Sequence, residues 1–360
     1  MGILCLLRPS GIIRNMQNKG GVTMRIHELG EFGLIDRLAA RLGEPDESVV
    51  VGIGDDAAVV QYAPDMQVVT TTDMLVEGVH FRRDTIDDRS LGYKSLAVSI
   101  SDIAAMGGRA KHAVLSLAIP VDLDVERLDE LYIGVQEICT EYGTHVVGGD
   151  VVKTSGPFVI SVTVLGVVEA GKALLRSGAR PGDLIYLTGT VGGSAAGLDL
   201  LEQGQGLAAT LSEQQKADLL RFHQRPAPQV PGGRILLQSG GCTSANDVSD
   251  GVASELNEIS KMSGVQLVVE AGKLPIHDSV RAYAALRGQD PLQWALFGGE
   301  DYQLIGTLDP AKRAEIEADF AKAGLALTII GHAEAGAGVV LLQDGTRREL
   351  RPKGFNHFGS

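Results

Sequence analysis

The sequence predicts a mixed α/β (α+β) protein of two domains, and three observations support this. The chain has 360 residues, of which 44% are hydrophobic and 21% charged, an ordinary globular composition and a length that favours two domains. Short runs rich in Val, Thr and Ile alternate with segments of helical periodicity in both halves. A turn-like break at residues 166–175 separates the halves, so we expect domains at 24–168 and 169–360.

In the first half, apolar side chains at helical spacing predict a helix over residues 31–42. Residues 48–63 and 66–81 are rich in Val, Thr and Ile and predict a strand, a turn and a second strand. Segments 90–108 and 124–143 predict two long helices that end at glycines. Further strands are expected over 111–120, 144–152 and 158–169. The expected order is β-β-α-β-α-β-β.

The second half also alternates between the two patterns. Helices are expected over 194–204, 212–224, 249–264 and 277–286. Strands are expected within 176–193 and over 265–275, 302–308, 327–333 and 337–342. The second domain is therefore also predicted to be α/β.

The chain is acidic, with a net charge of −13 at pH 7 and a pI near 5.1. A protein that binds nucleic acid needs a basic face to neutralise phosphates, so this charge argues against that class. It also constrains any phosphate-rich ligand. Such a ligand would have to bring cations, or be bound by local Arg, Lys and backbone N–H groups.

Cysteine use and hydropathy indicate a cytoplasmic protein. Cys5, Cys139 and Cys242 are far apart and lack C-x-x-C pairing, which is typical of a reduced protein without disulfides or a zinc cluster. No apolar run approaches the roughly 18 residues that a membrane-spanning helix needs. Residues 1–23 are basic but lack a signal-peptide core and cleavage site, so we expect a disordered extension before Met24.

The stretch "VVVGIGDDAAVV" at residues 49–60 allows several interpretations. Its glycines fit the G-x-G-x-x-A spacing of a dinucleotide-binding turn, and Asp73 lies where such a fold places its ribose acid. That interpretation requires a helix after Gly54, whereas the following residues are β-branched and two carboxylates would repel a pyrophosphate. Two interpretations of the stretch therefore remain. It is either a hairpin turn in which Asp serves the turn geometry, or a metal site formed by Asp55 and Asp56.

The metal interpretation is favoured because acids recur beside glycines or at the ends of apolar runs. They are Asp55, Asp56, Asp73, Asp102, Asp150, Asp247, Asp250, Glu300 and Asp301. Mg²⁺ takes oxygen ligands, typically one or two carboxylates together with phosphates and water. Each acid alone is more often a turn residue or a helix cap, as Asp247 would be before the helix near Gly251. Together they favour a magnesium site.

Familiar phosphoryl-transfer and hydrolase motifs are absent from the sequence. There is no G-x-x-x-x-G-K-[ST] loop, no H-R-D or D-F-G element and no G-x-S-x-G elbow. His80 in "EGVHF" is a single histidine after a strand, and a packing role is as good an interpretation as a binding one. A P-loop enzyme and a protein kinase are therefore excluded.

Several motifs together resemble the thiamine-monophosphate kinases, a family related to aminoimidazole ribonucleotide synthetase and selenophosphate synthetase. They are "GEFGLIDRL", "GIGDDAAV", "TTTDMLVEGVHF", "YKSLAVSISDIAAMGG", "VVGGDVVK", "LLRSGARPGDLIYLTG", "RPAPQV", "NDVSDGV", "FGGEDYQL" and "KGFNHF". The resemblance extends from about Gly30 to Phe358. The chain departs from the pattern at Asn246, where an apolar residue is common, and at Phe355, where Trp or Tyr is also found.

This resemblance implies an enzyme that uses ATP and several Mg²⁺ ions to phosphorylate thiamine monophosphate, forming thiamine diphosphate and ADP. It also implies a homodimer in which the N-terminal sheets pair into a barrel-like core. The attacking group would be a phosphate oxygen that is already ionised at neutral pH. We therefore expect metal-assisted transfer with no catalytic acid, base or nucleophile from a side chain.

The resemblance further implies which residues form the site. The metal ligands would be Asp55, Asp56, Thr71, Thr72, Asp73, Asp102, Asp150, Asp247 and Asp250. The ATP contacts would be Tyr132, Gly149, Asp150, Arg176 and Ser249. The substrate contacts would be His80, Glu300 and Phe355. Without the resemblance, Arg176 also fits a surface ion pair and Tyr132 a core aromatic residue.

Two other functions are compatible with the motifs. One is another activity of the same superfamily, in which ATP activates an amide or a ribonucleotide. The other is an inactive module that binds metal or nucleotide and regulates another protein. The presence of the whole set of acids argues against an inactive module, because such a relative would be free to lose some of them.

Overall fold

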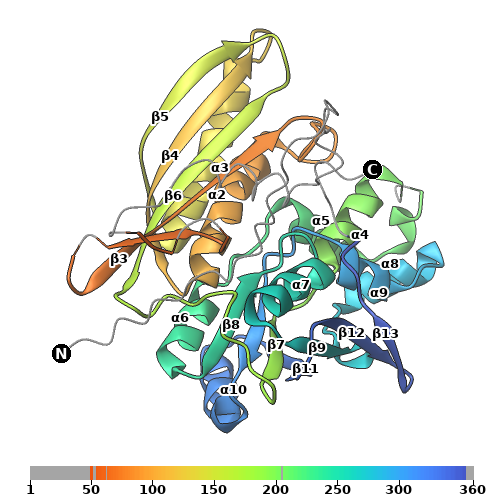
Figure 1. Ribbon diagram of the computed structural model, residues 1–360. Coiled ribbons are helices and arrows are strands. Elements are labelled where there is room, and N and C mark those ends of the chain that lie inside the picture. The colour runs from red at the N-terminus through yellow and green to blue at the C-terminus, as the bar shows by residue number, and fades with distance from the viewer. Residues whose placement is uncertain (1–48, 52–53, 62, 204–205, 354–360) are drawn as a thin grey trace, which may run out of the picture. The chain divides into compact units, whose positions relative to one another are not determined.

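The computed structural model describes residues 49–51, 54–61, 63–203 and 206–353, which form two mixed sheets and their helices (Figure 1). The mixed α/β class expected from the sequence is confirmed. The extension expected at 1–23, the helix expected at 31–42 and Phe355 lie outside the described residues. Within the described part of the chain, no helix is long and apolar enough to cross a membrane.

The first sheet has six strands in the order β1-β2-β3-β6-β4-β5. Its strands are β1 (Val49–Val51), β2 (Ala58–Gln61), β3 (Met66–Val76), β4 (Arg109–Pro120), β5 (His145–Thr154) and β6 (Val159–Glu169). All neighbours are antiparallel except β4 and β5, which are parallel. The two long helices expected here are confirmed as α2 (Asp88–Ala105) and α3 (Val125–Tyr142).

The stretch around Gly54 is a turn between two strands. β1 pairs antiparallel with β2, and Gly54 has a φ of 122°, a conformation that strongly favours glycine. Because a strand and not a helix follows, the dinucleotide-binding interpretation is excluded. The turn places Asp55 and Asp56 at one end of the sheet.

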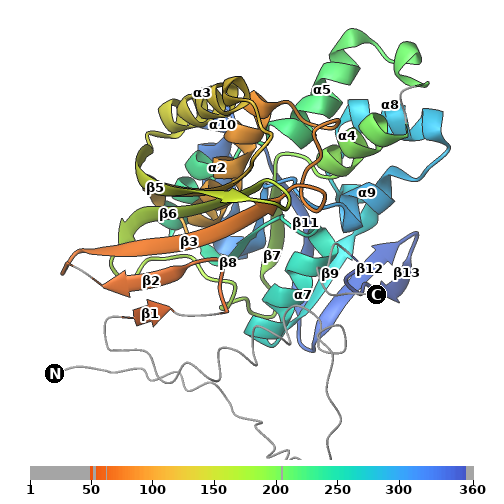
Figure 2. The same ribbon diagram turned by 90° about the horizontal axis from the view of Figure 1, so that it is seen from above.

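Among the described residues, helices α2 and α3 lie against one face of the first sheet. Figure 2 shows α2 and α3 on the same side of β3, β4 and β6. Along β6, buried and half-buried residues alternate, and the buried ones include Ile160, Val162 and Val164. This period of two is expected where one face packs on helices. The edge strand β5 is different, because nearly all of its residues are exposed.

The second sheet has seven strands in the order β13-β12-β9-β11-β7-β10-β8, antiparallel except for β12 with β9. Its strands are β7 (Leu184–Thr188), β8 (Cys242–Asp247), β9 (Gln266–Glu270), β10 (Leu304–Leu308), β11 (Leu327–Glu334), β12 (Gly338–Gln343) and β13 (Thr346–Glu349). Its α-helices are α4 (Gly193–Glu202), α5 (Glu213–Gln224), α6 (Val230–Ser239), α7 (Val252–Ser263), α8 (Asp278–Arg287), α9 (Pro291–Phe297) and α10 (Arg313–Lys322). Short 3₁₀ turns occupy Ala208–Thr210, Ala271–Lys273 and Pro310–Lys312.

Five elements of this half were not expected from the sequence: α6, β8, α9, α10 and β13. The edge strand β8, "CTSAND", has no run of large apolar residues, and hydrogen bonding to β10 keeps it in the sheet. In α10 only Ile316 and Phe320 are buried, so a single i, i+4 pair replaces the longer apolar stripe that a sequence pattern would reveal.

Helix α2 is buried on nearly all sides, with 15 of its 18 residues buried. It packs against β3, β4 and β6 of the first sheet and also against α6 and β8 of the second half. Its approach to α3 is very close. A Cβ added at Gly92 would meet the Leu131 carbonyl oxygen at 1.8 Å, and one added at Gly134 would meet the Arg89 carbonyl oxygen at 1.7 Å.

Gly92→Ala should therefore destabilise the protein even though alanine is the better helix former by about 1 kcal/mol. Relieving the clash requires α2 and α3 to separate, and we expect a net loss of about 1–3 kcal/mol in the free energy of unfolding. Urea unfolding at equilibrium would measure it. Gly272→Ala is the matched control, because nothing lies within 4 Å of its added Cβ. An unchanged midpoint for Gly92→Ala would contradict the glycine-dependent packing.

Candidate active site

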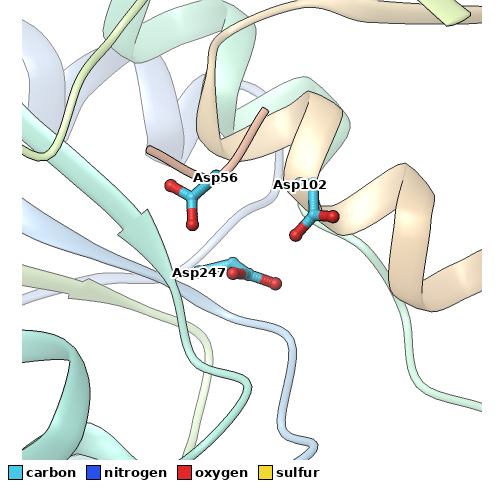
Figure 3. A group of neighbouring side chains, drawn as sticks. All are labelled: Asp56, Asp102 and Asp247. Atoms are coloured by element: carbon cyan, nitrogen blue, oxygen red, sulfur yellow. The ribbon is translucent and has the colours of Figure 1, made fainter. Parts of the chain in front are cut away.

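Three acids from distant parts of the chain converge at α2. Asp56 lies between β1 and β2, Asp102 lies on α2, and Asp247 is the last residue of β8. Each offers one carboxylate oxygen, and these oxygens all lie within 4.8 Å of one another. Figure 3 shows the three side chains directed toward a common space. All three belong to the metal set proposed from the sequence.

Hydroxyl groups fix the acids of this cluster. Thr71 Oγ1 donates to Asp102 Oδ2, and Ser101 Oγ donates to Asp247 Oδ2, both at 2.5 Å. Asp73 on β3 accepts in the same way from Ser99 on α2. One helix and its neighbouring strand thus orient several acids at once. Thr72, by contrast, bonds to Val162 O and Thr163 Oγ1 on β6.

Arg176 contacts the turn that contains Asp55 and Asp56. Its Nε lies 3.1 Å from Asp56 Oδ1, and its Nη2 also donates to that oxygen. Its backbone N–H donates to the Asp55 carboxylate at 3.3–3.4 Å. The two aspartates therefore differ, because Asp56 contacts the side chain of Arg176 and Asp55 its backbone. The surface ion-pair interpretation of Arg176 is wrong, since its side chain is only 17% exposed.

Burial and mutual repulsion raise the pKa values of these acids. Burial is the main cause for Asp55, whose pKa rises to about 7, and the Asp56 charge adds to it. Burial also raises the pKa of Asp247 to about 8, again with a contribution from Asp56. The pKa of Asp102 is raised well above its usual range by burial and by the neighbouring Asp73 and Asp247. The cluster therefore resists simultaneous ionisation.

The donor set fits a hard divalent cation. Asp56 Oδ2 is buried and has no hydrogen-bond partner among the described residues. An unpaired buried polar atom is costly and rare in folded proteins. This oxygen is therefore a candidate ligand for a cation. Carboxylate and hydroxyl oxygens are the ligands that Mg²⁺ takes, and a dication would relieve the repulsion among the acids.

The loop after β8 is built on two buried residues that the sequence patterns did not indicate as functional. Asn246, fully buried, accepts from Arg176 Nε at 3.2 Å and donates to Glu255 Oε2 at 2.6 Å. Glu255 Oε1 accepts from the backbone of Asp250 at 2.8 Å and from Ser249 Oγ at 3.3 Å. Asn246 therefore links Arg176 to the loop, which gives its polar side chain a structural reason.

A second polar cluster surrounds Glu300, which was predicted to contact the substrate. Glu300 Oε2 lies 2.9 Å from Lys94 Nζ and 3.5 Å from His223 Nδ1. Burial raises the pKa of Glu300, but Lys94, His223 and His80 outweigh it, and the net shift is downward. His80, the second predicted substrate residue, contributes to this shift. Sequence patterns missed Lys94, because its partner Glu300 lies 206 residues later in the chain.

The remaining predicted residues lie elsewhere on the first domain. Asp150 and Gly149 are exposed on β5, and Tyr132 is 42% exposed on α3. The register runs from Gly149 to Leu115 on β4, to Val162 on β6 and to Asp73 on β3. Three strand spacings amount to about 14 Å. Within one chain, Asp150 on β5 therefore lies three strands away from β3, which bears Asp73.

Known proteins match this chain over most of its length. The family model of the AIR synthase related protein N-terminal domain matches residues 54–168, and that of its C-terminal domain matches 180–343. The thiamine-monophosphate kinase of Bacillus subtilis is 39% identical over 341 residues, covering 92% of this chain and 100% of the relative. The chain belongs to the thiamine-monophosphate kinase family. The family's member from Aquifex aeolicus is 37% identical over 340 residues, covering 93% and 100%.

Solved structures of the family match the fold. The structure described as AaThiL complexed with AMPPCP and TMP has 36% identity and a TM-score of 0.80, covering 94% of this chain and 100% of that one. Thiamine-monophosphate kinase from Stenotrophomonas maltophilia K279a has 36% identity and a TM-score of 0.72, covering 89% and 98%. The two-domain mixed α/β fold expected from the sequence is confirmed.

The stability of the metal-free protein should fall as pH rises from about 5 to 8. Asp55 and Asp247 have native pKa values of about 7 and 8 against an ordinary value of 3.8, so the native state binds more protons than the unfolded state in this range. Stability contributed by their protonation is therefore lost as pH rises. We expect a loss of more than about 1 kcal/mol in urea unfolding with a chelator present.

Asp247→Asn should flatten this profile, and saturating Mg²⁺ should raise the wild-type curve most at pH 8. Asp84→Asn is the control, because Asp84 is exposed, pairs with Arg82 and has a lowered pKa. A wild-type profile that rises between pH 5 and 8 would show that the acids are not coupled as the structure indicates.

Proposed function

We propose that this chain transfers the terminal phosphoryl group of ATP to the phosphate of thiamine monophosphate, forming thiamine diphosphate and ADP. The observation that supports this most directly is the convergence of Asp56, Asp102 and Asp247 in a member of the thiamine-monophosphate kinase family. Acids that bind Mg²⁺ explain how a chain with a net charge of −13 can bind two phosphorylated reactants. We place the reaction in the cytoplasm.

The proposed metal site comprises two groups of ligands. The central group is Asp56, Asp102 and Asp247, with Asp55, Thr71, Thr72, Asp73 and Asp250 around it. Asp150 would bind a separate ion that is shared with the nucleotide, because it lies about 14 Å across the sheet from Asp73. When bound, Mg²⁺ would neutralise phosphate charge during the transfer.

The protein's own contribution is to position the reactants. Arg176 presents forked donors next to Asp56, a geometry suited to phosphate oxygens as well as carboxylates. Ser249, Gly149 and Tyr132 complete the proposed ATP contacts. The thiamine moiety would be bound by His80, Glu300 and Phe355. Glu300 would accept a hydrogen bond from the aminopyrimidine or face the cationic thiazolium. Phe355 would stack on a ring.

The chemistry needs no general base. An ionised oxygen of the acceptor phosphate forms a bond to the γ-phosphorus of ATP, and the bond between that phosphorus and the β,γ-bridging oxygen breaks. The electron pair of the broken bond leaves with ADP. Holding two anions in line is the main barrier, so orientation and charge neutralisation account for most of the rate enhancement.

We also propose that two copies of the chain associate through β5, with their first sheets forming a barrel-like core. This edge strand exposes Val146, Val147, Val151 and Val152. An uncovered edge strand with apolar side chains on both faces is a template for pairing with another strand. Covering β5 would bury these side chains and bring Gly149 and Asp150 into the interior of the assembly.

The activity is tested by incubating the protein with ATP, Mg²⁺ and thiamine monophosphate and measuring thiamine diphosphate and ADP, which should form in equal amounts. Asp102→Asn and Asp150→Asn should each lower the rate about 100-fold or more, because each removes a proposed metal ligand. Asp102→Asn should unfold no more easily than wild type, since it relieves repulsion. Asp84→Asn should keep full activity.

Two results would contradict the proposed kinase activity and favour another function. ATP binding without any diphosphate would point to a regulatory module. ATP consumption only with an amide or ribonucleotide acceptor would point to another activity of the superfamily.

The association through β5 is tested by the double substitution Val147→Asp and Val151→Asp. Charges on both exposed side chains should halve the mass measured by light scattering, because a carboxylate buried in an apolar interface is strongly unfavourable. Val121→Asp, at a position that is 78% exposed in the turn after β4, should leave the mass unchanged. A double variant with the wild-type dimer mass would rule out β5 as the contact.

A further inference from the structure

Lys94 is a charged residue in the interior of the molecule. Its side chain is only 1% exposed, in the middle of the buried helix α2. Its Nζ lies 2.9 Å from Oε2 of Glu300, which follows 206 residues later in the chain. The pair therefore joins the central helix of the first domain to the segment between α9 and β10.

Stability alone gives no reason for a lysine at this position. Moving an ammonium group out of water costs several kcal/mol, which a single carboxylate partner only partly offsets. Apolar side chains of similar volume are often as stable or more stable in place of buried ion pairs. The neighbours on α2 are small or apolar, so methionine or leucine would suit the helix itself. The reason for the charge of Lys94 must therefore be sought in its effect on Glu300.

Glu300 is held by more than this ion pair. His223 Nδ1 lies 3.5 Å from the same oxygen of Glu300 and 3.0 Å from Ser194 Oγ. The backbone N–H of Glu300 donates to Ser249 O at 2.7 Å, and Glu300 has a φ of 65°. This left-handed conformation is unfavourable for a residue with a side chain, and such strain tends to persist at functional sites.

We propose that Lys94 is a positioning residue for substrate recognition. Its ammonium group engages Oε2 of Glu300 and keeps the carboxylate ionised, which leaves Oε1 for the organic part of the substrate. The Glu300 side chain is 29% exposed although Lys94 is buried, so part of the Glu300 side chain remains accessible to a ligand. This inference rests on the proposed role of Glu300 in binding thiamine monophosphate.

The test compares Lys94→Met with wild type in steady-state kinetics. The variant should raise the KM for thiamine monophosphate about tenfold, while the KM for ATP stays within about twofold. Lys94→Gln keeps an N–H donor without the charge and should raise the same KM by a smaller factor. It also serves as the second variant if methionine prevents folding. Lys273→Met, which breaks an exposed Lys–Glu pair, is the matched control.

A purely structural lysine predicts a different pattern. Melting temperature and the amount of active enzyme would fall, and the folded fraction would keep the wild-type KM for both substrates. That result would overturn the proposal.

Calorimetric titration with thiamine monophosphate, without ATP, separates this inference from the proposed function. If the wild type makes no diphosphate, the proposed function fails, and the titration still compares the affinities of wild type and variants. A tenfold weaker affinity in Lys94→Met supports the role of Lys94. Equal affinities, or no binding to wild type, overturn it.

Discussion

The site depends on one constraint, which is that α2 is buried on almost every side and still bears polar groups. Buried polar atoms need partners, and three of the polar side chains of α2 find theirs among the acids of the site. Ser99 donates to Asp73, Ser101 donates to Asp247, and Lys94 contacts Glu300. The helix thereby satisfies its own polar groups and sets the position of every acid that it contacts.

A second consequence is that the two halves of the chain meet at this helix. Asp56 and Asp73 come from the first sheet, whereas Asp247 comes from the last residue of β8 in the second. Close packing through Gly92 leaves α2 little freedom to move away from them. The carboxylates therefore remain close together despite their repulsion, which adds to the effect of burial in raising the pKa of Asp247.

Much of this was accessible from the sequence, because residue patterns predicted α2, α3 and the strands β3 to β6, although the single strand expected over 48–63 is two strands, β1 and β2. The acids beside glycines predicted the cluster of Asp56, Asp102 and Asp247. The partners of these acids were not predictable. Lys94 and Asn246 act through contacts with residues 206 and 70 positions away, and no local pattern encodes such distances. The five elements missed in the second half are likewise stabilised by contacts with residues distant in the sequence, which a local pattern does not show.

The arrangement around Asp56 shows how one carboxylate can serve two partners. Arg176 Nε and Nη2 both donate to Oδ1, and Oδ2 is buried without a hydrogen-bond partner in the part of the chain that the structure describes. A cation at Oδ2 would therefore not displace the arginine, and both could face one phosphate group from adjacent positions. Asn246 also accepts from Arg176 Nε and so helps to hold the guanidinium beside Asp56.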